Sequence, residues 1–200
     1  QNGCQNTATV SVATLAIDPG TIQFTGGGTT LDRCVGQAIP VIAQLTAATG
    51  GGNGNYVYNW QSYTDNVTFT DVGAAGTGTT LTVATLQTAQ TVYYKRGVRD
   101  ANAAASALVY TPAVTLNIRA LPTVAITPLS SNIPTGASIT LTATAGAGYA
   151  YVWSASAGSA TTQAVTRTEV AAGTYSYTVT VTDGFSCQNT SAAASVVVSN

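Results

Sequence analysis

The sequence predicts an all-β protein of two tandem β-sandwiches, and three observations support this fold class. Short runs of strand-favouring residues alternate with polar ones and are interrupted by Gly, Asn, Asp or Pro at about every eight to twelve residues. No amphipathic stretch is long enough for an α-helix. An aromatic pattern ending in tryptophan occurs twice, as Tyr56-Val57-Tyr58-Asn59-Trp60 and as Tyr149-Ala150-Tyr151-Val152-Trp153.

The repeated aromatic pattern predicts the core of each sandwich. Successive side chains of a strand point to opposite faces, so the three rings of each copy share one face. We therefore expect Trp60 and Trp153 to be core residues, with Tyr93 and Tyr175 packing beside them from partner strands. The alternative is that the two indoles are exposed platforms on which sugars stack.

The first domain is expected at residues 17–119, after a separate segment of residues 1–16. Its strands are predicted by alternation and bounded by turn residues such as the Gly50–Asn55 loop. The predicted strands are Thr21–Thr25, Ile39–Ala47, Tyr56–Ser62, Val67–Asp71, Thr79–Val83, Val92–Arg99 and Ala107–Ile118.

The second domain is expected at residues 120–200, beginning at the short junction Arg119-Ala120-Leu121-Pro122. It follows the same scheme with shorter connections. The predicted strands are Thr123–Thr127, Ser138–Ala145, Tyr149–Ser154, Thr161–Thr168, Thr174–Thr182 and Ser191–Ser199.

Residues 1–16 resemble a final strand without a domain of its own. The sequence Cys4-Gln5-Asn6-Thr7 recurs unchanged as Cys187-Gln188-Asn189-Thr190, and strand-like sequence follows each copy. A lone strand exposes unpaired backbone groups and needs a partner sheet. Either a preceding repeat of a tandem array ends here, or residues 1–16 act as a donor strand that completes a sheet in a neighbouring copy.

Composition excludes several classes of partner. Charged residues are 6% of the chain and the net charge is −1, so no basic surface is expected for nucleic acid or for anionic lipid. No apolar run approaches the ~18 residues that cross a bilayer, so we expect no membrane insertion and place any export signal upstream. A surface of hydroxyls and amides is typical of secreted modules.

The residues that could bind a metal or form disulfides are few. There is no histidine, and Cys4, Cys34 and Cys187 form no Cys-x-x-Cys pair, so no metal site is expected. We expect the cysteines to be unpaired or mispaired, with a Cys4–Cys34 bridge as the alternative. The acids are scattered singly, and Asp65-Asn66 and Asp183-Gly184 fit turns better than calcium ligands.

No residue pattern indicates catalysis. Without histidine, Gly-x-Ser-x-Gly or Ser-x-x-Lys, no hydroxyl nucleophile is activated in a recognisable way, so we expect no catalytic residues, no cofactor and no enzyme. The only lysine lies in Tyr94-Lys95-Arg96, which we interpret as an exposed strand edge whose charges prevent aggregation. A Lys–Asn crosslink at Lys95 is the alternative.

Both domains resemble known surface modules. Tyr58–Val72 with Thr91–Arg96 is similar to a repeat of giant cell-surface proteins of Bacteroidota, and Tyr151–Ser154 with Thr178–Cys187 resembles a PKD-type immunoglobulin-like module. The first repeat usually has a second cysteine where this chain has Ala103-Ala104-Ala105, so an intradomain disulfide is not expected.

These resemblances imply an extracellular, cell-surface structural segment. Such modules form the stalks of gliding-motility adhesins and other proteins exported by the type IX route, whose partners are neighbouring repeats of the same polypeptide. The alternatives are an accessory module of a secreted enzyme that binds surface polysaccharide, or a self-assembling filament subunit that uses residues 1–16 in donor-strand exchange.

Overall fold

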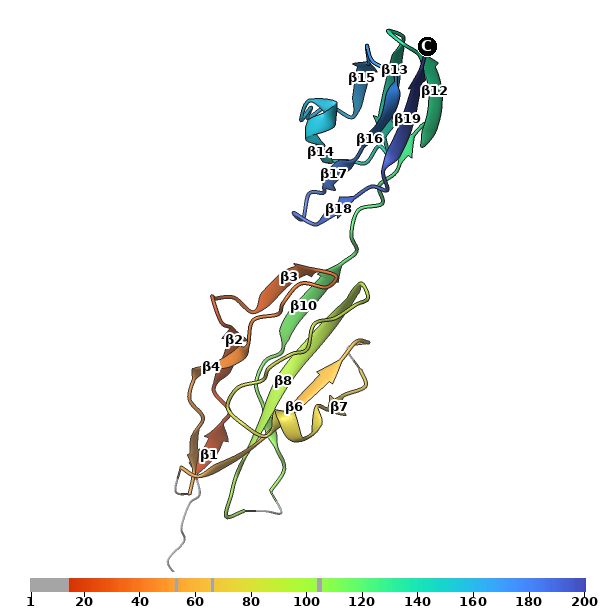
Figure 1. Cartoon of the computed structure of the whole chain (residues 1–200). Helices are drawn as coiled ribbons and strands as arrows, with labels where there is room; N and C mark the ends of the chain where they lie inside the picture. The colour runs from red at the N-terminus through yellow and green to blue at the C-terminus, as the bar shows by residue number, and fades with distance from the viewer. Residues whose placement is uncertain (1–14, 53, 66, 104–105) are drawn as a thin grey trace, which may run out of the picture. The chain divides into compact units, whose positions relative to one another are not determined.

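The structure is a computed structural model that describes residues 15–52, 54–65, 67–103 and 106–200. It divides into two compact units. The first comprises the described residues up to Leu31 together with 38–84 and 91–117, and the second comprises 32–37, 85–90 and 118–200. Within the described ranges the elements are β-strands and two short 3₁₀ turns, with no α-helix, which confirms the predicted all-β fold class of two immunoglobulin-like sandwiches (Figure 1).

The first unit contains most of a sheet of six strands among the described residues, although residues 32–34, 90 and 118–119 of that sheet belong to the second unit. The strand order is β3-β10-β8-β6-β7, and β9 pairs with β8 beside β10. The bounds are β3 Thr30–Cys34, β6 Tyr56–Tyr63, β7 Thr70–Asp71, β8 Gln90–Asp100, β9 Val109–Tyr110 and β10 Val114–Arg119. The strand pairs β1–β5 and β2–β4 complete it, with β1 Leu15–Asp18, β2 Thr21–Phe24, β4 Ile42–Thr46 and β5 Thr49–Gly51.

The core of the first unit lies around Trp60, which is fully buried. Alternation along β6 and β8 points one set of side chains inward, and Phe24, Ile42 and Leu81 of the same unit are also fully buried. The indole nitrogen of Trp60 donates a hydrogen bond of 2.8 Å to the Gly78 carbonyl. The polar edge of the ring is thereby satisfied inside an apolar core.

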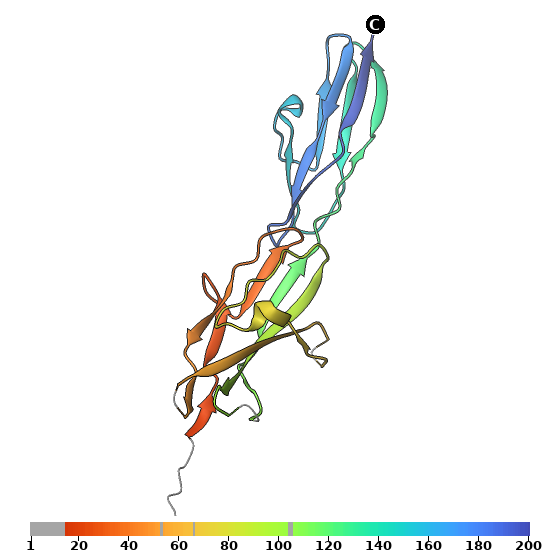
Figure 2. The same cartoon turned by 60° about the horizontal axis from the view of Figure 1, so that its bottom comes forward.

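The second unit contains three sheets of three strands among the described residues, in the orders β11-β13-β15, β12-β19-β16 and β14-β17-β18. Figure 2 shows the same strands from a second direction. The bounds are β11 Ile126–Thr127, β12 Ser130–Pro134, β13 Ser138–Ala143, β14 Ala150–Trp153, β15 Ala164–Thr168, β16 Gly173–Tyr177, β17 Val179–Thr182, β18 Gln188–Thr190 and β19 Ala194–Ser199.

The last strand of the second unit is central in its sheet. β19 pairs in parallel with β12 on one edge and antiparallel with β16 on the other. Its alternate residues Ala194, Val196 and Val198 are buried against Trp153 in one hydrophobic cluster. The indole nitrogen of Trp153 donates to the Thr162 carbonyl at 2.8 Å, so both units cap their central tryptophan with a backbone acceptor.

Several predicted strands differ from the structure. The segment Thr174–Thr182 is two strands of different sheets, because Thr178 leaves the ladder and exchanges hydrogen bonds with Ser154. Thr79–Val83 forms only the bridge between Ile42 and Leu81. β3 and β12 were not expected, since Thr30–Cys34 and Ser130–Pro134 are polar and show little apolar alternation.

The expectation for residues 1–16 falls mostly outside the described residues. The exceptions are Leu15 and Ala16, which lie in β1. β1 pairs antiparallel with β5 of the same chain, where Leu15 lies opposite Gly51 and Asp18 opposite Thr49. The donor-strand alternative therefore concerns residues 1–14, which lie outside the described residues.

The interpretation of Tyr94-Lys95-Arg96 as an exposed strand edge is wrong. β8 is an inner strand, since it pairs with β6 on one side and with β9 on the other. Tyr94 and Arg96 point into the core and are buried, and Lys95 is partly buried on the opposite face. Charges alone do not distinguish an edge strand from an inner one when a long side chain is held by neutral acceptors.

Arg96 is a fully buried guanidinium held by neutral oxygens. Its Nη2 donates to the Pro19 carbonyl at 2.7 Å, and its Nη1 donates to Gln44 Oε1 at 2.9 Å and the Thr79 carbonyl at 3.3 Å. Burial lowers the pKa of Arg96, and the nearby Tyr58 opposes that shift. These bonds connect β8 to segments that lie before β2, in β4 and after η1 (Gly73–Gly76).

We expect Arg96→Lys to lower the free energy of unfolding of the first unit by about 2 kcal/mol. A lysine has no planar fork, so at least one of the buried oxygens loses its donor, at a cost of about 1–3 kcal/mol. Urea unfolding monitored by fluorescence measures the loss. Arg99→Lys is the matched control, because Arg99 lies on the opposite face of the same strand and is only partly buried. Equal stability of the two variants would contradict the assigned role.

Candidate functional site

A disulfide between Cys34 and Cys187 is the most distinctive chemical feature of the described residues. Cys34 ends β3, Cys187 immediately precedes β18, and the bonded residues are separated by 153 positions in the sequence. Both side chains are buried, and both cysteines belong to the second compact unit. The expectation of unpaired cysteines, and the alternative Cys4–Cys34 bridge, are therefore wrong for Cys34. Cys4 lies outside the described residues.

The turn that carries Cys187 is organised by one carboxylate. Asp183 Oδ1 accepts hydrogen bonds from the backbone N–H groups of Phe185 and Cys187, both at 2.9 Å. Ser186 occupies the left-handed region with φ 64° between them. Asp183-Gly184 is thus a turn, as expected from its sequence, and it fixes the direction from which Cys187 approaches Cys34.

A side-chain oxygen also holds the turn that follows Cys34. Its N–H donates to Gln37 Oε1 at 2.9 Å, and its carbonyl accepts the Gln37 N–H at 3.0 Å. The residues that follow are held in the second unit, since the Val35 N–H donates to the Arg119 carbonyl and the Gly36 N–H to the Leu86 carbonyl. The backbone N–H groups of both cysteines are therefore held by side-chain acceptors, Gln37 Oε1 for Cys34 and Asp183 Oδ1 for Cys187.

Charged and aromatic side chains surround the bridge. Arg119 pairs with Asp32 at 2.6 Å and stacks over the Phe185 ring at 4.2 Å, while Asn189 donates to the Pro122 carbonyl at 2.9 Å. A cavity of about 270 Å³, lined in part by Cys34, Leu121 and Ser186, lies beside the disulfide. These contacts connect residues 32–37, 118–122 and 183–189 into one cluster, which we call the disulfide cluster.

A second feature is an aromatic and amide face on the outer side of β6 and β8. Tyr63 and Tyr93 lie opposite each other in the ladder, and their rings stack at 4.8 Å with an interplanar angle of 8°. Phe69 contacts Tyr63 edge-on at 4.3 Å. Lys95 Nζ lies 3.0 Å from the centre of the Phe69 ring and 4.0 Å from that of Tyr110.

The polar part of this outer face is centred on Asp71. Its Oδ1 accepts hydrogen bonds from Gln61 Nε2 at 2.9 Å and Asn59 Nδ2 at 3.0 Å. These bonds, that from Gln61 first, lower the pKa of Asp71, while burial lowers the pKa of Lys95. The ammonium group of Lys95 lies against aromatic rings, and these contacts give no support to the Lys–Asn crosslink alternative.

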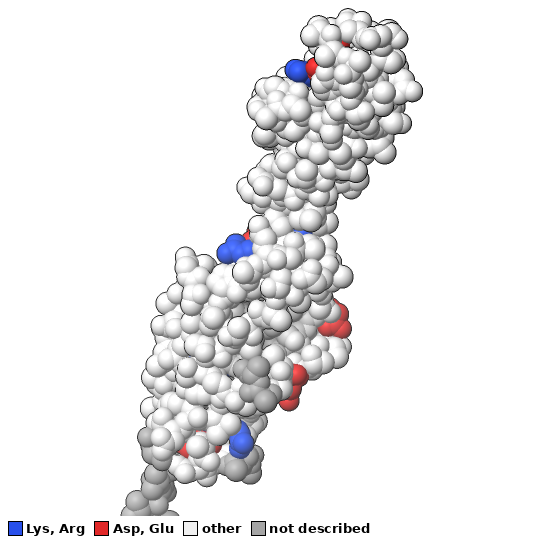
Figure 3. All heavy atoms as spheres, viewed as in Figure 1, with Lys and Arg blue, Asp and Glu red and all other residues white. Residues whose placement is uncertain are grey.

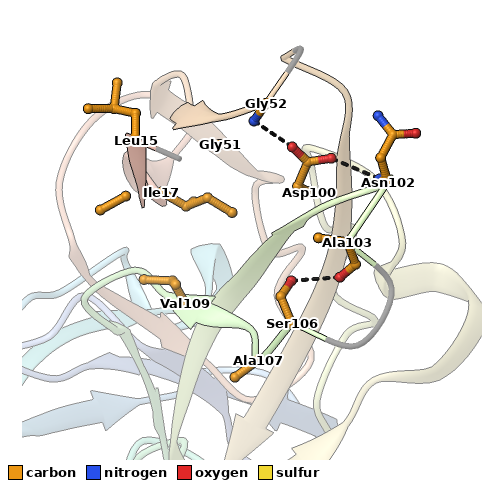
Figure 4. A pocket seen from close by; sticks show the side chains of 11 residues that line it. Leu15, Ile17, Gly51, Gly52, Asp100, Asn102, Ala103, Ser106, Ala107 and Val109 are labelled. Carbon is orange, nitrogen blue, oxygen red and sulfur yellow. Dashed lines mark hydrogen bonds between the residues drawn. The ribbon is translucent and has the colours of Figure 1, made fainter. Parts of the chain in front are cut away.

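A third feature is a cavity of about 480 Å³ at one end of the first unit. Its walls are mainly apolar, with Leu15, Ile17 and Val109 among the lining residues (Figure 4). The carboxylate of Asp100 lies between the N–H groups of Asn102, at 2.8 Å, and Gly52, at 2.6 Å. These two bonds, that from Asn102 first, lower the pKa of Asp100 and engage both carboxylate oxygens in shaping the surrounding loops.

Three of the four predicted core residues lie in or against a core, and the fourth, Tyr93, does not. Trp60 and Trp153 are almost completely buried, which leaves neither indole as an exposed sugar platform. Tyr175 is partly buried and packs against the core cluster of the second unit. Tyr93 lies on the outer face, and its neighbour Tyr94 is the buried residue, because adjacent residues of a strand point to opposite sides.

Charged groups are sparse on the face shown in Figure 3, where most of the surface comes from uncharged residues. In the ranges that the structure describes, no group of three or more His, Cys, Asp or Glu side chains is arranged to hold a metal ion. Nor does any helix in that part of the chain have the length and apolar character needed to span a membrane.

Comparison with known proteins bears mainly on the fold. Residues 28–120 match the family described as "Domain of unknown function (DUF8696)". No curated protein matches the chain.

Among solved structures, the chain is similar to the N-terminal four Ig domains of Dscam1 isoform 6.9, with TM-score 0.44 and 10% identity over 96% of this chain and 48% of that one. For isoform 7.44 the TM-score is 0.42, at 13% identity and the same coverage. The fibronectin(III)-like modules of Clostridium thermocellum CbhA match with TM-score 0.34 and 16% identity over 89% of this chain and 93% of theirs. The chain spans about half the length of the Dscam1 chains.

Tyr94 makes the stability of the first unit depend on pH in the alkaline range. Burial raises the pKa of its phenol from 10.0 to about 12. The folded state therefore keeps this proton at a pH where the unfolded state loses it. Its contribution to stability is complete below pH 10 and is lost as the pH rises from about 10 to about 12.

We expect the unfolding midpoint of the wild-type chain to fall more steeply between about pH 9.5 and about 11.5 than that of Tyr94→Phe. The phenylalanine keeps the ring in the core but has no proton to lose. Urea titrations at a series of pH values measure the two slopes, with Tyr56→Phe as a control for a phenol on the neighbouring strand. Parallel slopes for the wild type and Tyr94→Phe would contradict the assignment.

Proposed function

We propose that this chain is a structural segment of an extracellular surface protein, in which tandem sandwiches space an adhesive part away from the cell. The observation that carries the proposal is the buried Cys34–Cys187 bond in a chain of two sandwich units. Structural disulfides persist in oxidising compartments outside the cytosol, and autonomous sandwiches are the usual units of extended surface proteins. The uncharged surface fits the same setting.

The resemblance of the sequence to Bacteroidota surface repeats and PKD-type modules supports a finer assignment. On that basis the parent protein is a gliding-motility adhesin or a related protein exported by the type IX route. The recurrence of Cys4-Gln5-Asn6-Thr7 as Cys187-Gln188-Asn189-Thr190 supports neighbouring repeats as its main partners. In this role the chain needs no catalytic residue or cofactor.

Localisation on intact cells of the source organism tests the proposal. Antibodies raised against the purified chain should label unpermeabilised cells, and external protease should remove the signal. A cytosolic marker that survives the same protease treatment is the control. Labelling that appears only after permeabilisation would contradict an extracellular role.

The aromatic and amide face favours a second candidate function, namely binding of surface polysaccharide by an accessory module. Stacked or exposed rings beside amide and carboxylate groups are the combination that sugar-binding surfaces use. Phe69 is 38% exposed and lies at this face with Asn59, Gln61 and Asp71. We expect this function to show as binding on a glycan array that Phe69→Ala abolishes.

Val152→Ala is the control for the glycan array, because Val152 is 53% exposed on the second unit and far along the chain from this face. Binding that both variants retain would exclude the face as the binding site. An array without any bound glycan would favour the structural role alone.

A further inference from the structure

The disulfide makes the covalent path between the two ends of this chain much shorter than the path along the backbone. A pull applied to the two ends passes from the N-terminal end to Cys34, crosses the disulfide to Cys187 and continues to Asn200. The residues between the two cysteines form a closed loop off this path. Tension between the two ends cannot extend that loop while the sulfur bridge is intact.

We propose that the Cys34–Cys187 disulfide is a force bypass that keeps residues 35–186 from being extended while the chain is under tension. The inference rests on the proposed function as a structural segment, and it adds the mechanical role of one bond. The loop contains both core tryptophans and the whole aromatic and amide face. A binding surface carried there would therefore bear no direct tension from the two ends of the chain.

The segments that remain on the force path are the first three strands and the last two. On the C-terminal side the main element is β19, the central strand between β12 and β16. Five register pairs join it to each neighbour, from Ser130–Ser195 to Pro134–Ser199 on one edge and from Gly173–Val198 to Tyr177–Ala194 on the other. A strand held on both edges resists removal better than an edge strand, since both ladders must break.

The N-terminal side of the force path is held more weakly. β1 and β2 each belong to a two-stranded pair, and β3 is at the edge of its sheet. We therefore expect β1 to β3 to detach before β19 does. Even after both segments detach, the bridge limits the further extension.

Hydrogen bonds and a ring contact hold the chain on both sides of the bypass bond. Asp183 holds the turn before Cys187, Gln37 holds the turn after Cys34, and Arg119 contacts both Asp32 and Phe185. These contacts add non-covalent support around the two bonded cysteines.

Single-molecule force spectroscopy on the full chain tests the proposal, with handles at both ends and flanking reference domains for calibration. A Cys4→Ser background prevents thiol exchange. Without the bridge, unfolding should release an additional contour length of about 500–550 Å, since 153 residue steps extend by ~3.3–3.6 Å each. The oxidised chain should lack this release, and Cys34→Ala with Cys187→Ala should show it.

A second measurement does not depend on the folding of that double variant. The oxidised chain is held at constant force and a reductant is then added, so that the contour length of each chain should increase by about 500–550 Å in total as its two units unfold. Full extension of the oxidised chain before reductant is added would overturn the bypass. Its outcome is independent of cell-surface labelling, so the bypass and the proposed function can fail separately.

Discussion

Removal of the Cys34–Cys187 bond should lower the free energy of unfolding by about 4 kcal/mol. The bond closes a loop with a sequence separation of 153, which restricts the unfolded chain. In the chain-entropy description, a loop of ~100 residues gives about 4.7 kcal/mol, and native disulfides typically contribute about 2–5 kcal/mol. Urea unfolding of Cys34→Ala with Cys187→Ala, compared with the Cys4→Ser chain, measures the effect. Alanine avoids leaving a buried hydroxyl at either site.

Cysteine pairing is checked on the same samples. Alkylation of the native chain without reductant should leave Cys34 and Cys187 unmodified, and alkylation after unfolding and reduction should modify all three cysteines. Modification of Cys34 or Cys187 without reductant would contradict the bridge. A double variant as stable as its parent would show that the bond does not stabilise the folded chain.

Replacement of Trp153 by alanine should destabilise the second unit by about 3–5 kcal/mol. The side chain is 1% exposed and lies in the cluster that includes Leu141, Val179 and Val196. Its removal leaves a large cavity and also leaves the Thr162 carbonyl without its indole donor. A loss of this size is a large part of the total stability of a domain of this length.

The two tryptophans allow this prediction to be measured unit by unit. Each unit contains one of them, so Trp153→Ala leaves Trp60 as a fluorescent reporter of the first unit. Circular dichroism follows both units in the same titration, so a transition that comes before the change in Trp60 fluorescence reports the second unit. Val152→Ala, one position earlier and 53% exposed, should change stability little. An unchanged midpoint for Trp153→Ala would refute the core assignment.

The sequence determines much of this fold because strand alternation is a local property. Trp60 and Trp153 could be placed from their own neighbours, since the rings stand at every second residue and therefore share one face of the strand. Tyr93 was misplaced by one position, because Tyr93 and Tyr94 are adjacent aromatics and either can point inward. β12 could not be found, because its polar residues become a strand only when β19 pairs with them.

The disulfide could not be predicted for a related reason. Cys34 and Cys187 are each an ordinary cysteine in a turn, and their pairing depends on residues 32–37 belonging to the second compact unit. Nothing local to either residue encodes this assignment. The turn at Asp183 could be predicted from its own sequence, whereas the partner of Cys187 could not. The aromatic and amide face was missed similarly, since Phe69 and Tyr110 reach Lys95 from separate segments.

The central position of β19 also determines when the sheet of β12, β19 and β16 can form during synthesis. A polypeptide that emerges from its amino end presents β12 and β16 well before Ala194–Ser199, the strand that joins them. Until β19 emerges, these two edge strands have no common partner, and the core cluster lacks Ala194, Val196 and Val198. The joining of β12 to β16 is therefore a late step in the formation of this unit.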